Sequence, residues 1–186
     1  QQDTDLVDRT KGRILLQVEE NGEAWYVEPD LEEKYYLRDG TAAYAALRRF
    51  GLGISNADLE KIPVGIEERF DELDTDADGL SDKLEEALGS DATDKDSDAD
   101  GFEDGAEVAS DFSPTGPDAI RTDALLRERL AGKILLQVES RGEAWYINPT
   151  DHRRYYMTDG EAAYQIMRFL SLGITNTDLR RIPVGE

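Results

Sequence analysis

The chain has 186 residues, of which 39% are hydrophobic, and carries a formal net charge of −21. This length allows one or two domains with real cores, and the hydrophobic content favours folding over disorder. The strong negative charge argues against nucleic-acid binding, which needs clustered lysine and arginine. The absence of cysteine excludes disulfides, a thiolate nucleophile and zinc–thiolate sites. No apolar run is long enough to predict a membrane span.

Residues 12–65 and 132–185 are two copies of one sequence unit, related by a fixed offset of 120 residues. Of the 54 aligned positions, 31 are identical, and both copies end in Ile-Pro-Val-Gly. A duplicated unit of this size indicates one domain used twice. The likeness weakens upstream of each copy.

Each copy shows the hydrophobic pattern of a small antiparallel meander. Apolar residues alternate from Ile14 to Val18, which predicts a half-buried strand. Asn21-Gly22 is typical of a two-residue type I′ turn. Strands over residues 23–27 and around 35–37 complete the meander.

Helices are expected after the meander. Asp39-Gly40-Thr41 opens a helix that runs through Phe50, and Gly51 ends it. Ser55 has the pattern of an N-cap for a short second helix reaching Ile62. A further helix over residues 118–130 leads into the second copy, with a weaker counterpart at residues 3–11. Each copy is therefore predicted to be a compact α+β unit.

The segment between the copies carries most of the charge, because 17 acidic residues and two lysines fall within residues 71–111. Residues 74–85 and 96–107 each place carboxylates at positions 1, 3, 5, 9 and 12 of a twelve-residue loop, with glycine at position 6. This is the ligand spacing of an EF-hand calcium loop, in which position 7 adds a backbone carbonyl. We expect two Ca²⁺ ions. The predicted ligands are Asp74, Asp76, Asp78, Leu80, Asp82, Glu85, Asp96, Asp98, Asp100, Phe102, Asp104 and Glu107.

The loop positions predict distinct roles. Glu85 and Glu107 at position 12 should bind with both carboxylate oxygens, whereas the aspartates at position 9 act through water. Since position 7 contributes only its carbonyl, Leu80 and Phe102 can place their side chains in a small shared core. Short helices are expected over residues 66–73 and 82–88. The alternative is a solvated acidic linker, which two complete loops make the weaker interpretation.

Two features depart from the EF-hand pattern. Position 8 is Ser81 or Glu103 where an aliphatic residue is usual, and the loops begin about 22 residues apart, too close for two helix-loop-helix units. The Asp-rich string over residues 74–107 resembles bacterial thrombospondin type 3 repeats. That resemblance implies an extracellular, calcium-stabilised spacer or adhesive stalk. The flanking copies are similar to a repeat of predicted secreted bacterial proteins, which implies no activity.

Paired aromatic residues offer a second interpretation. Strand geometry turns one residue of each pair towards the core, which leaves Trp25, Tyr36, Trp145 and Tyr156 as candidates for binding a glycan. Cross-strand aromatic pairs also stabilise sheets without any ligand. The single histidine, His152, has no counterpart in the first copy, and we expect it at the surface.

The sequence thus predicts an α+β protein in which two duplicated domains flank a calcium-loop module with short helices. The expected boundaries are a first copy at 1–65, the double loop at 66–111, a linker and helix at 112–131, and a second copy at 132–186. The predicted function is a non-enzymatic, calcium-binding structural or adhesion protein, secreted or at the cell surface. A cell-surface glycan or another envelope protein would be its partner. The alternative is a carbohydrate- or peptidoglycan-binding module with calcium as a scaffold.

Overall fold

The computed structural model describes residues 4–185 and has an α+β architecture, as the sequence predicts. The first copy and the helix before it contain α1 (Thr4–Thr10), β1 (Ile14–Gln17), β2 (Ala24–Glu28), β3 (Glu33–Leu37), α2 (Gly40–Phe50), β4 (Leu52–Ile54) and α3 (Asn56–Leu59). The second contains α6 (Ala124–Leu130), β7 (Ile134–Gln137), β8 (Ala144–Ile147), β9 (Arg154–Met157), α7 (Gly160–Phe169), β10 (Leu172–Ile174) and α8 (Asn176–Leu179). Between them lie α4 (Asp82–Leu88), α5 (Asp104–Ala109), β5 (Phe112–Ser113) and β6 (Gly116–Ala119).

The two copies exchange their last strands. Each copy builds the predicted antiparallel meander, but a fourth strand comes from the other copy and pairs in parallel, giving the sheets β10-β1-β2-β3 and β4-β7-β8-β9. Leu15 lies opposite Leu172, and Leu135 lies opposite Leu52, so the two exchanges have the same register. The copies are therefore interlocked.

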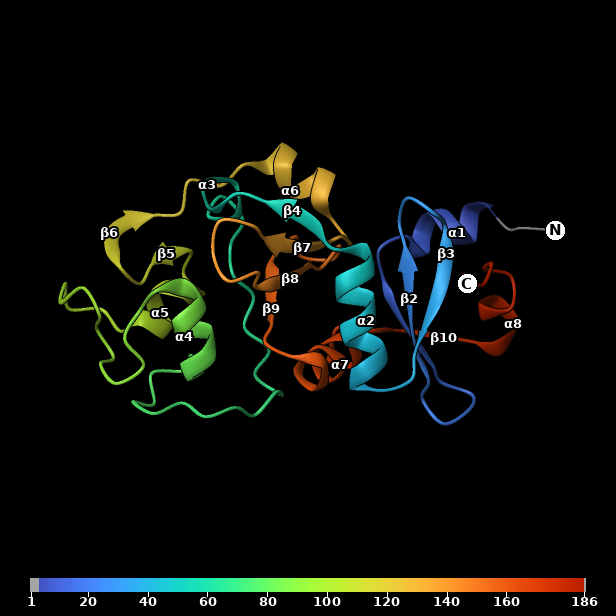
Figure 1. Ribbon diagram of the computed structural model, residues 1–186, viewed down its shortest axis with the longest axis horizontal. Coiled ribbons are helices and arrows are strands. Elements are labelled where there is room, and N and C mark those ends of the chain that lie inside the picture. The colour runs from blue at the N-terminus through green and yellow to red at the C-terminus, as the bar shows by residue number, and fades with distance from the viewer. Residues whose placement is uncertain (1–3, 186) are drawn as a thin grey trace.

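One hydrophobic core serves both copies. Helices α2 and α7 pack against each other between the two sheets (Figure 1), and the largest buried cluster contains matched residues such as Ile14 with Ile134. The Tyr26 hydroxyl donates to the Gly132 carbonyl at 2.9 Å, and the Tyr146 hydroxyl to the Gly12 carbonyl at 2.6 Å. These reciprocal contacts give the pair an approximate two-fold symmetry.

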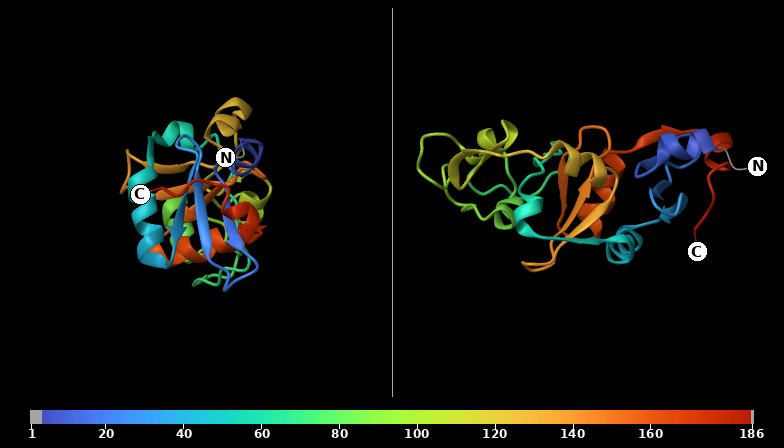
Figure 2. Two further views of the ribbon diagram at one scale, coloured as in Figure 1. Left: turned by 90° about the vertical axis from the view of Figure 1, so that its right-hand side faces the viewer. Right: turned by 90° about the horizontal axis from the view of Figure 1, so that it is seen from above.

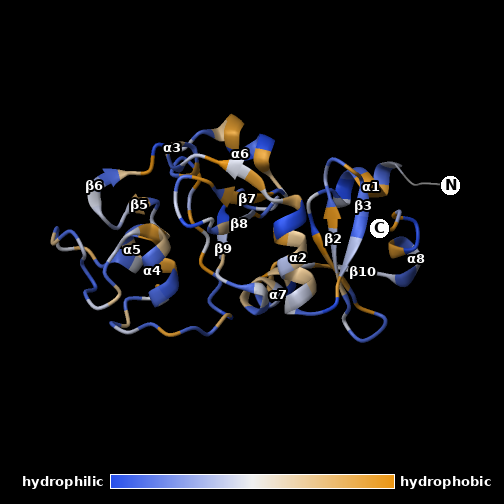
Figure 3. Ribbon diagram, in the orientation of Figure 1, coloured by the Kyte–Doolittle hydropathy of each residue, from blue (hydrophilic) through white to orange (hydrophobic). Residues whose placement is uncertain are grey.

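The acidic segment lies at one end of the molecule and not between the copies. Figure 1 and the view from above in Figure 2 place it beyond the sheet β4-β7-β8-β9, on the side away from the first sheet. Its loops are the most continuously hydrophilic part of the chain (Figure 3). A shared core and the strand exchange fix the relative placement of the two copies without the acidic segment.

Most predicted elements form close to their expected bounds, with three corrections. The Asn21-Gly22 turn is not type I′, since only its glycine has positive φ and residues 18–23 form a longer connection. Residues 66–73 contain a single turn, not a helix. Helix α6 starts only after its N-cap Asp123, because residues 116–119 pair with β5 in a hairpin. The first predicted helix forms as α1, and Asp3 lies outside the described residues.

The contact between Gly12 and Gly132 leaves no room for a side chain. A Cβ on Gly132 would lie 2.3 Å from the Gly12 Cα, and its φ of +77° is in the left-handed region. We expect Gly132→Ala to lower the free energy of unfolding by more than the ~1–3 kcal/mol of backbone strain alone. Denaturant unfolding measures this. Gly142→Ala is the matched control, since φ is +85° there but the space is open; equal losses in the two variants would contradict the tight contact.

Candidate metal centre

The two acidic loops share one backbone conformation. Loop position 4 is left-handed in both, with φ of 62° at Ala77 and 59° at Ala99. Position 6 is left-handed as well, with φ of 102° at Gly79 and 100° at Gly101, where a glycine adopts the sharp turn without steric cost. Two stretches with the same residue spacing thus fold the same way, as the loop pattern predicts.

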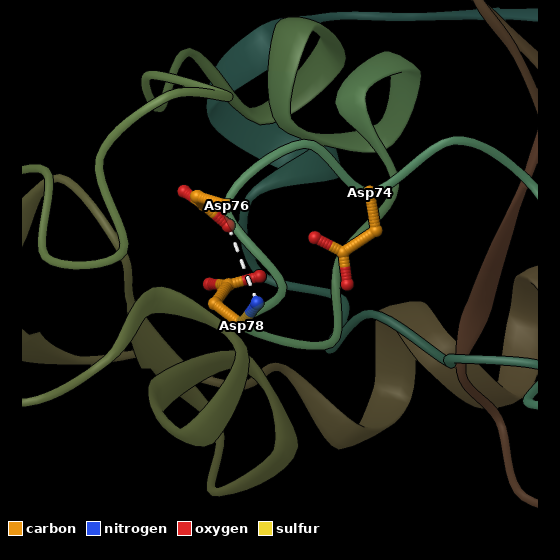
Figure 4. A group of neighbouring side chains, drawn as sticks. All are labelled: Asp74, Asp76 and Asp78. Atoms are coloured by element: carbon orange, nitrogen blue, oxygen red, sulfur yellow. Dashed lines mark hydrogen bonds between the residues drawn. The ribbon is translucent and has the colours of Figure 1, made fainter.

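The first loop gathers three aspartates around one point. Asp74, Asp76 and Asp78 each offer a carboxylate oxygen, and these oxygens lie within 4.8 Å of one another (Figure 4). Backbone amides of the loop hold them in place: Asp74 accepts from Ala77 at 2.7 Å, and Asp76 from Asp78 at 3.2 Å. The other oxygen of Asp76 is buried and has no hydrogen-bond partner. A cation is the natural partner for such a group.

Glu85 is the most unusual residue of the segment. It lies in α4, which begins at the N-cap Ser81, and it is 0% exposed. Neither of its carboxylate oxygens has a hydrogen-bond partner, while oxygens of Asp78 and Asp104 lie within 4.8 Å of one of them. Burial, followed by repulsion from neighbouring aspartates, raises the pKa of Glu85 to about 8.

The second loop repeats the cluster of three aspartates, but its Glu107 joins no group of carboxylates among the described residues. Asp96, Asp98 and Asp100 bring their carboxylate oxygens within 4.8 Å of one another. Glu107 in α5 is buried, and one of its oxygens has no partner. Burial is again the main cause that raises the pKa of Glu107, here to about 7, with Asp100 the strongest repelling charge. Both loops therefore offer an acidic group that lacks a counter-charge.

The aspartates at position 9 serve mainly to close the loops. Asp82 accepts hydrogen bonds from the amide and the hydroxyl of Thr75, both at 2.7 Å. Asp104 accepts the same pair from Ser97, at 2.9 and 2.6 Å. This occupation fits their predicted action through water, which stays a prediction. Asp104 is also fully buried and within reach of Glu85, so it joins the first loop's carboxylates as well as its own loop.

The two loops contact each other directly. The Gly105 amide at the start of α5 donates to Asp78 Oδ2 at 2.7 Å, and a Cβ at this position would collide with the Asp78 carbonyl. The Lys95 ammonium donates to the Ala77 carbonyl at 2.6 Å. The loops thus form one unit in which the second braces the first. Spacing within a loop could not predict these contacts.

The side chains at position 7 differ, which corrects one expectation. Leu80 is buried and packs with Leu84 and Val108 in a cluster that includes Trp145 of the second sheet. Phe102, by contrast, is 66% exposed. No small core shared by both residues forms, because only the first loop lies against the sheet.

The acidic segment covers the aromatic pair of the second copy only. Trp25 and Tyr36 stack with ring centroids 4.9 Å apart, as do Trp145 and Tyr156. Tyr36 is exposed, whereas Trp145 is completely buried beneath the segment. The end of each copy shows the same contrast, since Val64 is 2% exposed and its counterpart Val184 is 63% exposed. Of the four aromatic candidates, Trp145 presents no surface to a ligand.

Charge differs between the covered face and the open face. Arg141 of the second copy pairs with Glu86 at 2.6 Å, and Arg153 pairs with Asp111 at 2.8 Å. The first copy has an asparagine and a glutamate at the matching positions, so its face would not attract an acidic segment. Surface ion pairs contribute little stability individually. The charge difference between the matched positions is nevertheless visible in the sequence, although the overall similarity of the two copies draws attention away from it.

The donor set fits a hard divalent cation. Every clustered group is a carboxylate, and carboxylate and carbonyl oxygens suit calcium or magnesium, whereas zinc and copper favour nitrogen and sulfur.

Comparison of the chain with protein-family models, with curated proteins and with solved structures found no match. Among the described residues, no helix is long and apolar enough to cross a membrane. His152 is partly exposed and has a left-handed φ of 58°, almost the same as the 59° of Glu32, its counterpart in the first copy. The histidine therefore occupies a turn position that both copies share.

Proposed function

We propose that this protein is a calcium-binding structural or adhesion protein in which two Ca²⁺ ions fold the acidic segment and seat it on the second sheet. The observation that carries the proposal is Glu85, whose fully buried carboxylate has no partner for either oxygen. A buried anion without a partner is strongly destabilising, and one bound cation removes that cost.

The position of the segment gives the ions a mechanical role. Leu80 follows the loop glycine, and Leu84 precedes the position-12 glutamate. Both leucine side chains pack against the second sheet. An ion that fixes the loop therefore also fixes this apolar contact. Metal binding and docking of the segment become one coupled process.

Secretion or display at the cell surface is the setting proposed for this role. Calcium loops of the weaker class are saturated where the ion is plentiful, which is outside the cytosol. The resemblance to thrombospondin type 3 repeats supports the same placement and a spacer or adhesion role. We propose no enzymatic activity, and the partner would be a cell-surface glycan or an envelope protein.

Calorimetric titration with calcium tests the proposal directly. We expect about two ions per chain, with one lost in Glu85→Gln and one lost in Glu107→Gln, because each variant removes the position-12 ligand of a single loop. Glu86→Gln is the matched control, since this neighbour on α4 is exposed and pairs with Arg141. If wild-type protein gives no calcium-dependent heat, or if both glutamine variants still bind two ions, the proposal fails.

A carbohydrate-binding module remains the second candidate, and the open face of the first copy favours it. Tyr36 and Val184 are exposed there beside Trp25, whereas the equivalent face of the second copy is covered. Stacked aromatic rings at a surface are suited to packing on sugars. A glycan array probed with calcium-loaded protein separates the two functions. Binding of the protein to one class of glycan would favour this candidate, whereas calcium binding without any glycan binding would favour the first.

A further inference from the structure

A cavity of about 490 Å³ lies where the acidic segment and the hairpin after it meet the end of the first copy and Arg154 of the second copy. The hairpin of β5 and β6 forms one wall, and α3 and its following turn contribute to the other. Its lining is mixed, with apolar side chains such as Val64, Leu88 and Val108 and three cationic residues, Lys61, Arg121 and Arg154. The volume is in the range of sites that hold small molecules.

Arg154 is the anomalous residue of this cavity. It is only 6% exposed, and its buried Nε has no hydrogen-bond partner. Its guanidinium stands 4.5 Å from the ring centroid of Trp145 and makes no hydrogen bond or ion pair with the rest of residues 4–185. A guanidinium carries five N–H donors, and burying the Nε–H unpaired is unfavourable. This donor is therefore free for a bound anion, which can also reach the terminal N–H groups beside it.

The first copy shows how the same position is satisfied when no ligand is needed. Lys34 is the counterpart of Arg154 and is also buried over a tryptophan. Its ammonium donates to the carbonyls of Leu179 and Ile182, the latter at 2.6 Å. Lysine thus caps the turn after α8 from within the fold. In the second copy, the longer guanidinium of Arg154 makes no such contact with the turn after α3, which is the counterpart of the turn after α8.

We propose that this cavity binds a small monocarboxylate with an apolar body, its carboxylate held by Arg154 and its body lying against Val64, Leu88 and Val108. The planar guanidinium matches a carboxylate with two parallel hydrogen bonds. The two acidic residues of the lining, Glu60 and Asp118, nearly balance its three cationic ones. The charge of the lining therefore suits a singly charged anion better than a multiply charged phosphate. An apolar lining around one buried cation fits an amphipathic anion better than an inorganic one.

This site is separate from the calcium centre. None of its proposed contact residues belongs to either twelve-residue loop, although Leu88 and Val108 come from the helices that leave those loops. The cavity exists only while the segment is docked. Experiments on it therefore use the full chain under calcium-saturated conditions.

Hexanoate is a suitable probe, with hexanamide as its uncharged analogue. Calorimetry on the wild-type chain should show hexanoate binding at least about tenfold tighter than hexanamide, because only the carboxylate forms charge-assisted hydrogen bonds. Amide chemical shifts of residues 112–121 should move on hexanoate addition, which locates the ligand without any mutation. No hexanoate binding, equal binding of the amide, or shifts confined to other regions would each overturn the proposal.

Arg154→Lys is the decisive variant, because the first copy demonstrates that lysine is compatible with this position. We expect hexanoate affinity to fall about tenfold or more, as a lysine ammonium turned towards the neighbouring carbonyls leaves the anion without its fork of donors. An unchanged melting temperature would confirm the fold. Lys34→Arg is the matched control in the first copy, where no acidic segment encloses a cavity, and it should add no second site. Undiminished binding in Arg154→Lys would refute the role of the guanidinium.

Discussion

Chelating calcium should release the acidic segment while the strand-exchanged body of the protein stays folded. The body is held by a core that both copies share. This core includes Ile14, Tyr26 and Tyr146 and contains no residue of the two loops. The segment contacts the body through the cluster of Leu80, Leu84 and Val108. Without ions, the buried carboxylates repel one another and oppose this docking.

Hydrogen exchange with and without chelator measures this outcome by region. If free calcium is a hundred times the dissociation constant, each site multiplies protection on the order of a hundredfold, and two coupled sites on the order of 10⁴-fold. The gain should be confined to residues 74–107 and to the part of the second sheet that they cover. Amides of β1 and β2 are the internal control, because they lie at the far end of the molecule (Figure 1). Equal loss of protection in both sheets would show that calcium holds the whole fold and not one end.

The local elements were largely predictable because short-range chemistry determines them. Ser55 and Asp39 cap their helices with the expected side-chain hydrogen bonds to backbone amides. Alternating apolar residues gave β1, and the positions of glycine and aspartate gave both loops. These signals operate within a few residues, so one sequence is sufficient to detect them.

The strand exchange was not predictable because it leaves the local pattern unchanged. Leu52 pairs with Leu135 in the structure, and it would meet the equivalent Leu15 if each copy kept its own strand. Since residues 14–18 and 134–138 are identical, both arrangements bury the same side chains. Only the geometry of the connection after α2 decides between them, and no residue pattern reports it. Strand β4 is also just three residues long, too short for a periodic signal.

The metal centre was predictable within each loop but not between the loops. Asp74, Asp76 and Asp78 converge as their spacing predicts. The approach of Asp104 to Glu85 depends on how α5 packs against the first loop, where Gly105 allows the close contact. The same packing turns Phe102 outward. The position of a residue within a loop therefore determines its chemical type, whereas the elements packed against that loop determine how deeply the residue is buried.

The internal symmetry offers two similar faces, and the acidic segment lies on one of them. Two nearly equivalent aromatic faces exist, and the segment occupies the one that Arg141 and Arg153 mark with positive charge. The matching face around Tyr36 stays open. The duplication thus provides two copies of one surface, of which one is covered by the acidic segment and the other is exposed.

Glu85→Gln should stabilise the metal-free protein and destabilise the calcium-loaded protein, each relative to wild type. In metal-free wild-type protein, the folded segment keeps Glu85 protonated at neutral pH, since burial raises its pKa to about 8 from an ordinary value near 4.5. An unfolded segment releases that proton. Its stability is therefore greatest below pH 4.5 and declines as pH rises towards 8. Glutamine removes the ionisable group and should flatten this decline.

Neutralisation thus helps only where no ion is bound. At pH 8 without calcium, we expect Glu85→Gln to stabilise the segment by on the order of 1 kcal/mol or more, because the buried glutamine is neutral without taking up a proton. With calcium at a hundred times the dissociation constant, the variant should lack the ~2.7 kcal/mol that one site supplies. Hydrogen-exchange protection of the α4 amides, measured as a function of pH with and without calcium, gives both changes in stability. Glu86→Gln removes the same charge at an exposed position one residue away. If this control also stabilised the metal-free protein and destabilised the calcium-loaded protein, the effect would come from net charge and not from loss of a metal ligand.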